Sequence, residues 1–319
     1  MGYVYAGIDF GGMSVKVGLF AGEGGLLVKH AVPTSKEDGY EGTVAKTAEA
    51  VWQAMEKAGI PRRDLQAAGL GSPGVVDGKK GVVVRWSNYD WYDRPFAADL
   101  KNLLGVPVYI TNDANAAALG EAKFGASRQF ESSILITLGT GVGSGIIFDG
   151  KIYEGTDGAG TEAGHMVIVS GGYPCTCGRR GCFEVYSSAR ALIRLTRDGM
   201  TANRDSLMWS FAEDLDKVSG RTAFQAARGK DAAGQAVVDS YISYLADGIA
   251  NLVNILRPEA VLIGGGVSNE GEGLLGPLRP LVYERLLVSN DIVPLAIEKA
   301  VLGNDAGIYG AFALASGSR

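Results

Sequence analysis

The sequence lacks the features of an exported or membrane-embedded protein. Its first ten residues, MGYVYAGIDF, have no basic region ahead of an apolar one, so they do not form a signal peptide. No apolar run approaches the ~18 residues that a membrane-spanning helix needs. Cysteine is scarce, with three in 319 residues, and nothing else suggests an oxidising compartment. These absences predict a cytoplasmic protein.

Charge and composition narrow the class further. The formal net charge is −5 and there is no long basic run, so the electrostatic footprint of a nucleic-acid-binding protein is missing. The chain is 46% hydrophobic and 20% charged, which is ordinary for a soluble globular protein. Its length allows a large core and two lobes. The 47 glycines are many, and we expect them in loops whose backbone approaches ligands closely.

All three cysteines and one of the two histidines lie in a single stretch, Gly158 to Glu184. Cys175, Cys177 and Cys182 are spaced C-x-C-x4-C, and His165 lies ten residues before the first. Thiolate sulfur and imidazole nitrogen are ligands that tetrahedral Zn²⁺ favours, and Cys3His is a closed structural set. The stretch therefore predicts a structural zinc site. Two alternatives are ordinary buried cysteines and a disulfide that leaves one thiol over.

Two carboxylates in the same stretch are not required by a zinc site. Glu162 is three residues before His165, and Glu184 is two residues after Cys182. Zinc ligands at these positions would hold both glutamates in place, so we predict that they line a polar pocket. Taken singly, each glutamate could equally be a solvated surface residue, which is the usual case.

The chain opens with a strand, a glycine turn and a second strand. Tyr3–Ile8 is apolar, Asp9–Gly12 (DFGG) forms the turn, and Val15–Phe20 alternates as the second strand. Backbone N–H groups in such a turn can bind phosphate oxygens. Asp9 could hold Mg²⁺, directly or through water. The alternative is an ordinary β-hairpin.

The same pattern returns 128 residues later. Residues 8–11 (IDFG) align with residues 136–139 (ITLG), and Phe20 aligns with Phe148. The repeat predicts a duplicated lobe with two turns that hold a nucleotide triphosphate, although two unrelated hairpins would look similar. The P-loop pattern G-x-x-x-x-G-K-[ST] is absent. The second turn leads into a strand rather than a helix, which argues against a dinucleotide-binding unit.

A polar segment, Thr-Asn-Asp-Ala-Asn, follows the predicted strand Val106–Ile110 and leads into an alanine-rich helix. A carboxylate at this end of a strand lies where ligands bind in α/β sheets. Near a helix N-terminus Asp113 should stay ionised, and it could then accept a hydroxyl proton during phosphoryl transfer. The alternative, equally open, is that Asn112 or Asp113 only caps the helix.

Two further stretches could contact ligands. Residues 85–91 (RWSNYDW) mix flat aromatic rings with hydrogen-bonding groups, as sugar sites often do, but a packed loop explains them equally well. Gly264–Gly266 follow the predicted strand Ala260–Ile263, and glycines there let a flat group such as adenine lie against the backbone.

Other elements follow from periodicity and turn residues. Tyr40–Ala58 and Ala236–Leu256 have apolar residues at helical spacing, and for the second helix core packing is favoured over a dimer contact. Leu65–Leu70 is a short strand that runs into a turn-forming loop over Gly71–Asp77. A last helix is expected from Asn304 to Ala315.

Together these segments resemble the ROK family (repressors, open reading frames, kinases), and most of all its bacterial glucokinases. They span almost the whole chain, and the Glu-x-Gly-His plus cysteine cluster is far more specific than the glycine turns. The matching segments are Asp9-x-Gly-Gly12, Gly71-x-Pro-Gly-x-Val-Asp77, Asn112-Asp113-x-Asn-Ala-Ala, Gly139-Thr-Gly-x-Gly, Glu162-Ala-Gly-His165, Cys175-x-Cys-Gly-x-x-Gly-Cys-x-Glu184 and Ile263-Gly-Gly-Gly-Val267.

The resemblance implies an α/β protein with the actin-like (ribonuclease H-like) ATPase fold, in which ATP and sugar bind in a cleft between two lobes. We expect residues 1–112 to form a small N-terminal lobe, with a C-terminal helix in residues 303–319 packing back on it. Residues 113–302 would form a large lobe with the zinc motif and the nucleotide site. A homodimer is a family-level expectation.

The resemblance also implies an ATP-dependent hexose kinase acting at the 6-hydroxyl, most of all on glucose at the entry to glycolysis. Asp113 would be the catalytic base, and His165 would serve zinc with one ring nitrogen and sugar with the other. The implied sugar-binding residues are Gly74, Asn88, Asn112, Asp113, Glu162, His165 and Glu184. The implied residues at ATP and Mg²⁺ are Asp9, Gly11, Gly12, Gly139, Thr140, Gly141, Gly265 and Gly266. The implied zinc ligands are His165, Cys175, Cys177 and Cys182.

One position departs from the family. A threonine usually follows the first Gly-Gly, whereas this chain has Met13 and then Ser14. The hydroxyl expected beside the phosphates is lost or shifted by one residue, which puts phosphate affinity in doubt and could favour another phosphoryl donor. The second turn keeps Thr140.

Three alternatives to a glucokinase stay open. The first is a family kinase for another sugar, such as N-acetylmannosamine, N-acetylglucosamine, fructose or allose. The second is a sugar-responsive repressor, which we disfavour because the Asp9 turn leaves no room for an N-terminal helix-turn-helix of about 60 residues. The third is a sugar sensor without catalysis, against which the presence of Asp113 argues.

Overall fold

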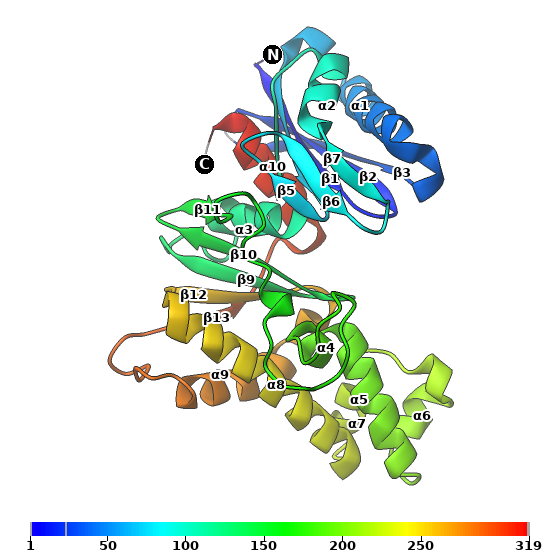
Figure 1. The fold of residues 1–319 in the computed structure, drawn as a ribbon, viewed down its shortest axis with the longest axis vertical. Helices are drawn as coiled ribbons and strands as arrows, with labels where there is room; N and C mark the ends of the chain where they lie inside the picture. The colour runs from blue at the N-terminus through cyan, green and yellow to red at the C-terminus, as the bar shows by residue number, and fades with distance from the viewer. Residues whose placement is uncertain (1, 23, 318–319) are drawn as a thin grey trace. The chain divides into compact units, whose positions relative to one another are not determined.

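The computed structural model describes residues 2–22 and 24–317 (Figure 1). The chain divides into two compact units. Unit 1 comprises residues 1–135, 145–161 and 301–319, and unit 2 comprises residues 136–144 and 162–300. In Figure 1 the blue and cyan segments and the red helix near the C-terminus belong to unit 1.

The first five-stranded sheet is mixed. Its strands, in spatial order, are β3 (Leu26–Pro33), β2 (Ser14–Ala21), β1 (Val4–Phe10), β4 (Leu65–Ser72) and β8 (Val108–Asn112). β1 pairs antiparallel with β2, β2 pairs antiparallel with β3, and the pairs β1–β4 and β4–β8 are parallel. The hairpin predicted around Asp9–Gly12 is confirmed, and its register places Asp9 opposite Lys16.

Helices cover this sheet because its strands alternate their side chains between two faces. The unit 1 helices are α1 (Gly39–Lys57), α2 (Phe96–Leu104), α3 (Asp113–Phe124) and α10 (Ala306–Ser316). Ile8 and Leu70 belong to a buried apolar core that includes Val44 and Val51 of α1. Gly7 and Gly69, one residue earlier in each strand, face α10 on the other side.

The contact between α10 and the sheet depends on glycine. A Cβ atom at Gly69 would lie 1.8 Å from the carbonyl oxygen of Ala311, and one at Gly310 would lie 1.6 Å from that of Ala116 in α3. Any larger residue would force the helix away from its neighbours. The expectation that glycines serve ligand loops is therefore wrong for these positions, because they lie inside strands and helices and allow close packing.

A small antiparallel sheet follows β4 in sequence. Its strands, in order, are β5 (Val75–Asp77), β6 (Val82–Trp86) and β7 (Trp91–Arg94). The loop expected over Gly71–Asp77 is therefore partly wrong, since its first two residues end β4 and its last three form β5. Val75 and Val76 pair with Arg85 and Val83 of β6. This pairing gives them an extended conformation, although the turn-rich composition had predicted an irregular loop.

The second five-stranded sheet repeats the order of the first. Its strands are β11 (Lys151–Tyr153), β10 (Val142–Phe148), β9 (Ser133–Leu138), β12 (Ala260–Gly264) and β13 (Ala296–Lys299). If the five strands of each sheet are numbered in chain order, both sheets have the spatial order third, second, first, fourth, fifth. β10 and β11 are antiparallel and β12 and β13 are parallel, as are their counterparts in the first sheet. The duplication predicted from the 128-residue repeat is confirmed at the level of topology.

Unit 2 is mostly helical. Its helices are α4 (Glu184–Ser187), α5 (Ala189–Ala202), α6 (Met208–Ala212), α7 (Thr222–Arg228), α8 (Ala232–Leu256) and α9 (Glu272–Glu284). Residues at helical spacing along α8, among them Tyr241, Leu245 and Ile249, are completely buried, so its core role is confirmed. The helix begins four residues earlier than predicted because the Asp231 side chain caps it, accepting from Gly234 N.

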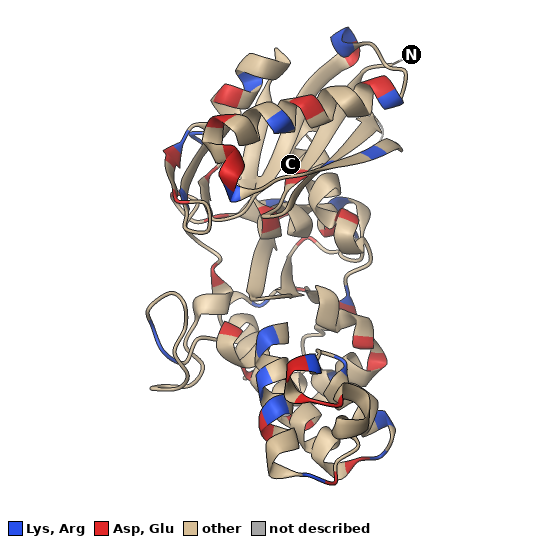
Figure 2. Ribbon diagram, turned by 90° about the vertical axis from the view of Figure 1, so that its right-hand side faces the viewer, with Lys and Arg blue, Asp and Glu red and all other residues tan. Residues whose placement is uncertain are grey.

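The division into units differs from the boundary expected at residues 112 and 113. Because α3 packs against α10, it belongs to the same unit as the first sheet. The helix α10 itself packs on β1 and β4, and we had expected a C-terminal helix to pack on this lobe. The boundary of the functional lobes stays a prediction. Charged residues of both signs are interspersed along the helices (Figure 2). Within the described residues, every helix is too short or too polar to cross a bilayer.

Candidate active site

The segment Asn112–Asp113 joins the end of β8 to the start of α3. The Asn112 side chain caps the helix, because its Oδ1 accepts from Ala114 N at 2.8 Å and from Asn115 N at 3.3 Å. Its Nδ2 donates to the carbonyl oxygen of Gly74 at 2.9 Å. Asp113 lies in the first turn of α3, where its Oδ1 also accepts from Ala114 N.

Three of the predicted sugar-binding residues in unit 1 are thus connected. Asn112 is fixed at both ends of its amide, to the helix and to Gly74, so it sets the geometry around Asp113. Asn112 caps the helix, as the capping alternative predicted, and a catalytic role for Asp113 stays a prediction. Asn88, the fourth residue, is exposed in the turn between β6 and β7.

The aromatic rings around Asn88 do not face solvent. Trp86, Tyr89 and Trp91 are 4%, 8% and 3% exposed, and they pack with Phe10 in the core of unit 1. For these rings the packed-loop alternative is correct, because they pack edge-on or stacked against one another. Only the polar residues of the stretch remain at the surface.

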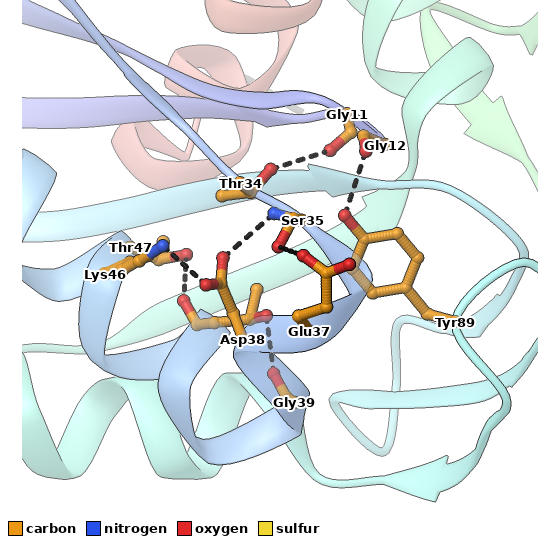
Figure 3. Close-up of polar contacts among 11 residues, drawn as sticks. Gly11, Gly12, Thr34, Ser35, Glu37, Asp38, Gly39, Lys46, Thr47 and Tyr89 are labelled. Atoms are coloured by element: carbon orange, nitrogen blue, oxygen red, sulfur yellow. Dashed lines mark hydrogen bonds and ion pairs between the residues drawn. The ribbon is translucent and has the colours of Figure 1, made fainter.

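The first glycine turn is held through its carbonyl oxygens (Figure 3). Gly11 accepts from the Thr34 hydroxyl at 3.5 Å, and Gly12 accepts from the Tyr89 hydroxyl at 2.9 Å. The backbone N–H of Thr34 donates to Met13 O at 3.1 Å. Met13 itself is 84% exposed, so its side chain contributes little to the packing of the turn.

Asp9 lies at the end of β1, just before this turn. Its Oδ2 forms an ion pair with the Lys16 ammonium at 3.0 Å across the hairpin. The start of α10 approaches closely, since a Cβ atom at Gly307 would lie 2.8 Å from Asp9 Cγ. A carboxylate and an ammonium therefore stand together beside the turn. Lys16 was missed by the sequence reasoning, although the hairpin register could have revealed it.

The second glycine turn lies in unit 2 beside a further glycine segment. Gly139 N donates to Gly141 O at 3.0 Å, and Ala189 N donates to Gly139 O at 2.9 Å. A Cβ atom at Gly265 would lie 2.5 Å from Leu138 O, immediately before the turn. The structure thus brings together five predicted nucleotide residues, which are Gly139, Thr140, Gly141, Gly265 and Gly266.

Glu184, at the start of α4, connects this turn with the cysteine stretch. Its Oε2 accepts from Val142 N at 3.2 Å, and its Oε1 lies 3.7 Å from Cys175 Sγ. A Cβ atom at Gly141 would lie only 2.0 Å from Oε2, so any larger residue there would displace the Glu184 carboxylate. On the other side of β10, Ala163 N donates to Ser144 Oγ, which holds the segment between Glu162 and His165.

His165 and the three cysteines form one cluster, with ligand atoms that all lie within 4.8 Å of one another. Cys175 Sγ is 3.6 Å from His165 Nδ1, and Cys177 Sγ is 3.7 Å from Cys182 Sγ. Tetrahedral geometry with Zn–S of about 2.3 Å and Zn–N of about 2.0 Å separates ligand atoms by about 3.5–3.8 Å. The cluster therefore fits a zinc ion, and Nδ1 is the nitrogen that faces it. All three thiols are free, so the disulfide alternative is wrong.

Burial and neighbouring charges shift the pKa of three groups here. Loss of hydration raises the pKa of Glu162 even though its side chain reaches solvent, and the charge of Glu184 acts in the same direction. Burial raises the pKa of the Cys182 thiol to about 12. A hydrogen bond from the backbone of Arg179 lowers the pKa of Cys177.

The predicted residues therefore fall into two groups. Unit 1 holds Asn112, Asp113, Gly74, Asn88 and the first glycine turn, whereas unit 2 holds the second turn, the cysteine cluster and both glutamates. The sequence reasoning missed Thr34 and Tyr89, and nothing in their local pattern indicated that they hold the first turn.

Comparison with known proteins gives the family. The sequence matches the ROK family over residues 5–318. The chain belongs to the ROK family. It is 37% identical to the glucokinase of Halalkalibacterium halodurans, over 96% of this chain and 93% of that protein. It is also 37% identical to the glucokinase of Thermotoga maritima, over 96% of this chain and 95% of that protein.

A solved ROK structure supports the same assignment. The ROK family glucokinase of Streptomyces griseus, in complex with glucose and AMPPNP, is 35% identical and superposes with a TM-score of 0.82. The match covers 98% of this chain and 99% of that chain. The predicted actin-like α/β fold and the predicted family are both confirmed.

Proposed function

We propose that this protein catalyses ATP-dependent phosphorylation of glucose at the 6-hydroxyl, giving glucose 6-phosphate and ADP. The observation that carries the proposal is the carboxylate of Asp113 in the first turn of α3, in a chain whose glucokinase relatives match it almost end to end. Asn112, Gly74 and exposed Asn88 lie in the same unit. They supply the amide and backbone groups that hydroxyls require.

Asp113 acts as general base in this proposal. It accepts the proton of the 6-hydroxyl as that oxygen attacks the γ-phosphorus of ATP, and the bond to the β,γ-bridging oxygen breaks as ADP leaves. The N–H groups of both glycine turns stabilise the negative charge on the transferring group. Asp9 is the group in unit 1 suited to Mg²⁺, and the neighbouring Lys16 ammonium adds positive charge for phosphate oxygens.

The cysteine cluster has a structural role. A zinc ion held by His165, Cys175, Cys177 and Cys182 would fix the loop that carries the sugar-binding groups, without taking part in the transfer. With Nδ1 directed at the cluster, the Nε2 of His165 is left to meet a sugar hydroxyl. Glu162 and Glu184 flank it and accept hydrogen bonds from further hydroxyls.

Three points stay predictions. A family kinase for another hexose shares these residues, because a single hydroxyl or acetamido difference depends on pocket shape. The preferred phosphoryl donor is the second, because Met13 lies in the turn that would bind the phosphates of the donor. A cytoplasmic location and a homodimer are expected from the sequence and the family alone.

The test is ADP release from ATP with a panel of sugars, measured on the parent protein and on Asp113→Asn. We expect glucose to be the preferred substrate and kcat to fall by about 10²–10⁴-fold in the variant, with glucose binding retained. Asp239→Asn, an exposed change on α8, is the matched control and should keep parental kcat. Unchanged turnover in Asp113→Asn would remove Asp113 from the mechanism, and preferred turnover of another sugar would move the substrate.

A further inference from the structure

The side chain of Tyr89 connects the turn that carries Asn88 with the first glycine turn. We propose that Tyr89 is a positioning residue through which glucose binding tightens the binding of ATP phosphates. This inference rests on the proposed function, since it assigns sugar to Asn88 and phosphate to the Gly11–Ser14 turn. All the contacts that carry it lie within unit 1.

The Tyr89 hydroxyl has a fixed position. Its ring stacks on Trp86 with centroids 3.8 Å apart and planes 12° apart. It also packs edge-on against Phe10 at 6.2 Å and Trp91 at 5.4 Å. A ring enclosed on these sides cannot choose another rotamer without disturbing the core. The hydroxyl therefore reaches one partner, the carbonyl oxygen of Gly12 at 2.9 Å (Figure 3).

Fixing this carbonyl fixes an N–H group. In a trans peptide the N–H points opposite to the C=O, so the Met13 N–H must point away from the Tyr89 hydroxyl. The Thr34 hydroxyl does the same for the preceding peptide by donating to Gly11 O, which orients the Gly12 N–H. Two successive N–H groups are thereby presented by the turn, and this is the arrangement that binds phosphate oxygens.

The departure at Met13 makes this orientation more important. The position after the glycine pair holds Met13, and the next hydroxyl is that of Ser14 one residue later, so phosphate binding at the turn relies more on backbone N–H groups and on Lys16. The hydroxyl of Tyr89 does not replace the missing one directly, because it is turned to the Gly12 carbonyl. It acts by holding the peptide that the phosphate would meet.

The link to sugar runs through one turn of backbone. Tyr89 N donates to Trp86 O at 3.3 Å and Asp90 N donates to Ser87 O at 3.4 Å, so Asn88 and Tyr89 occupy one tight turn. Asp90 closes it with a positive φ of 55° and pairs with Lys36. The ring keeps its place in the core, whereas Ser87, Asn88 and Asp90 of the turn are exposed. A hexose held by Asn88 would therefore act on the backbone of the turn and strengthen the hydrogen bond from the Tyr89 hydroxyl to Gly12 O. By linkage, phosphate bound at the glycine turn would then favour sugar at Asn88 equally.

The experiment compares Tyr89→Phe with Tyr92→Phe, a matched change at a ring that is 55% exposed on β7. Dissociation constants of Mg-AMPPNP are measured with and without saturating glucose, together with kcat and the KM values for ATP and glucose. In the parent protein we expect glucose to tighten nucleotide binding. In Tyr89→Phe we expect the KM for ATP to rise about threefold to tenfold, because one hydrogen bond is lost. We expect kcat to be nearly unchanged.

The coupling is the decisive readout. The ratio of nucleotide dissociation constants without and with glucose should fall toward one in Tyr89→Phe and stay parental in Tyr92→Phe. Thr34→Val deletes the hydroxyl on the other carbonyl, away from Asn88, and should weaken nucleotide binding while keeping the ratio. A parental ratio in Tyr89→Phe, or no effect of glucose on nucleotide in the parent protein, overturns the inference.

Failure of the inference can be told apart from failure of the proposed function. Binding of Mg-AMPPNP does not require turnover. If the parent protein phosphorylates glucose and Tyr89→Phe behaves like Tyr92→Phe, only the role of Tyr89 is lost. If the parent protein gives no sugar phosphate but glucose still tightens Mg-AMPPNP binding in a way that depends on Tyr89, the glucokinase function fails while the role of Tyr89 stands.

Discussion

The two glycine turns occupy equivalent places in two sheets of the same strand order, yet they are supported differently. The first, around Gly11 and Gly12, is held through its carbonyls by the hydroxyls of Thr34 and Tyr89. The second, around Gly139 and Gly141, is held by backbone hydrogen bonds and by the carboxylate of Glu184 near Val142 N. Duplication preserved the topology and left the supports free to diverge.

The difference shows how each turn is connected to groups that we propose bind the sugar. The first turn is connected through an aromatic core to the turn that carries Asn88. The second is connected through Glu184 to the cysteine cluster and so to His165. We therefore expect damage to the cysteine cluster to act on the second turn, and changes at the aromatic core to act on the first.

Among the changes that separate the two turns, the largest effect should follow loss of the proposed zinc ligand Cys177. Cys177→Ser removes one of the four proposed zinc ligands from a cluster that we expect to hold both predicted sugar-binding glutamates in place. We expect the variant to lose bound zinc and to bind glucose about 10- to 100-fold more weakly. Metal analysis and a glucose titration measure both. Prolonged chelation of the parent protein should reproduce the defect, and a Cys177→Ser protein with full zinc content would contradict the ligand assignment.

A smaller effect should follow Gly141→Ala in the second turn. The added Cβ would lie 2.0 Å from Glu184 Oε2 and would push the carboxylate from its place. We expect glucose affinity to fall roughly tenfold and the free energy of unfolding to fall by about 1 kcal/mol, because the displaced carboxylate loses its hydrogen bond from Val142 N.

Gly139→Ala is the matched control for that change, because a Cβ there meets no atom within 4 Å. Glucose affinity and the melting temperature are compared in the two variants, since both glycines are assigned to nucleotide. Equal effects of the two substitutions would show that the close approach of Gly141 to Glu184 has no consequence for glucose affinity or stability.

The smallest effect should follow Met13→Thr in the first turn. The side chain is exposed, so the exchange should cost little in folding. A hydroxyl beside the phosphates should lower the KM for ATP about twofold to fivefold, within the range of one hydrogen bond. ATP titrations at saturating glucose measure this. An unchanged KM would mean that the oriented N–H groups already suffice at this turn.

Much of the architecture was predictable because it follows from local pattern. Strand alternation, helical periodicity and the 128-residue repeat predicted the hairpins, α1, α8 and a duplicated lobe. The spacing of Cys175, Cys177, Cys182 and His165 gave a cluster that the fold closes to within 4.8 Å. These signals lie within short segments, so no knowledge of tertiary packing is needed to read them.

The remainder depends on contacts between distant segments. Nothing local to Gly69 or Gly310 indicates that α10 will lie against them, and that packing is what places α3 in unit 1. The aromatic residues near Asn88 looked equally suited to sugar and to a core, and only their own burial against Phe10 decides for the core. Tyr89 holds Gly12 across 77 residues of sequence.

The most direct test of the central claim is to identify the product. The purified protein is incubated with Mg-ATP and glucose, and the phosphorus species are followed by ³¹P NMR alongside ADP. We predict glucose 6-phosphate and ADP in equal amounts, with no product from Asp113→Asn on the same time scale. ADP without a sugar phosphate, or phosphate on a different hydroxyl, would contradict the assignment of Asp113 and the proposed reaction.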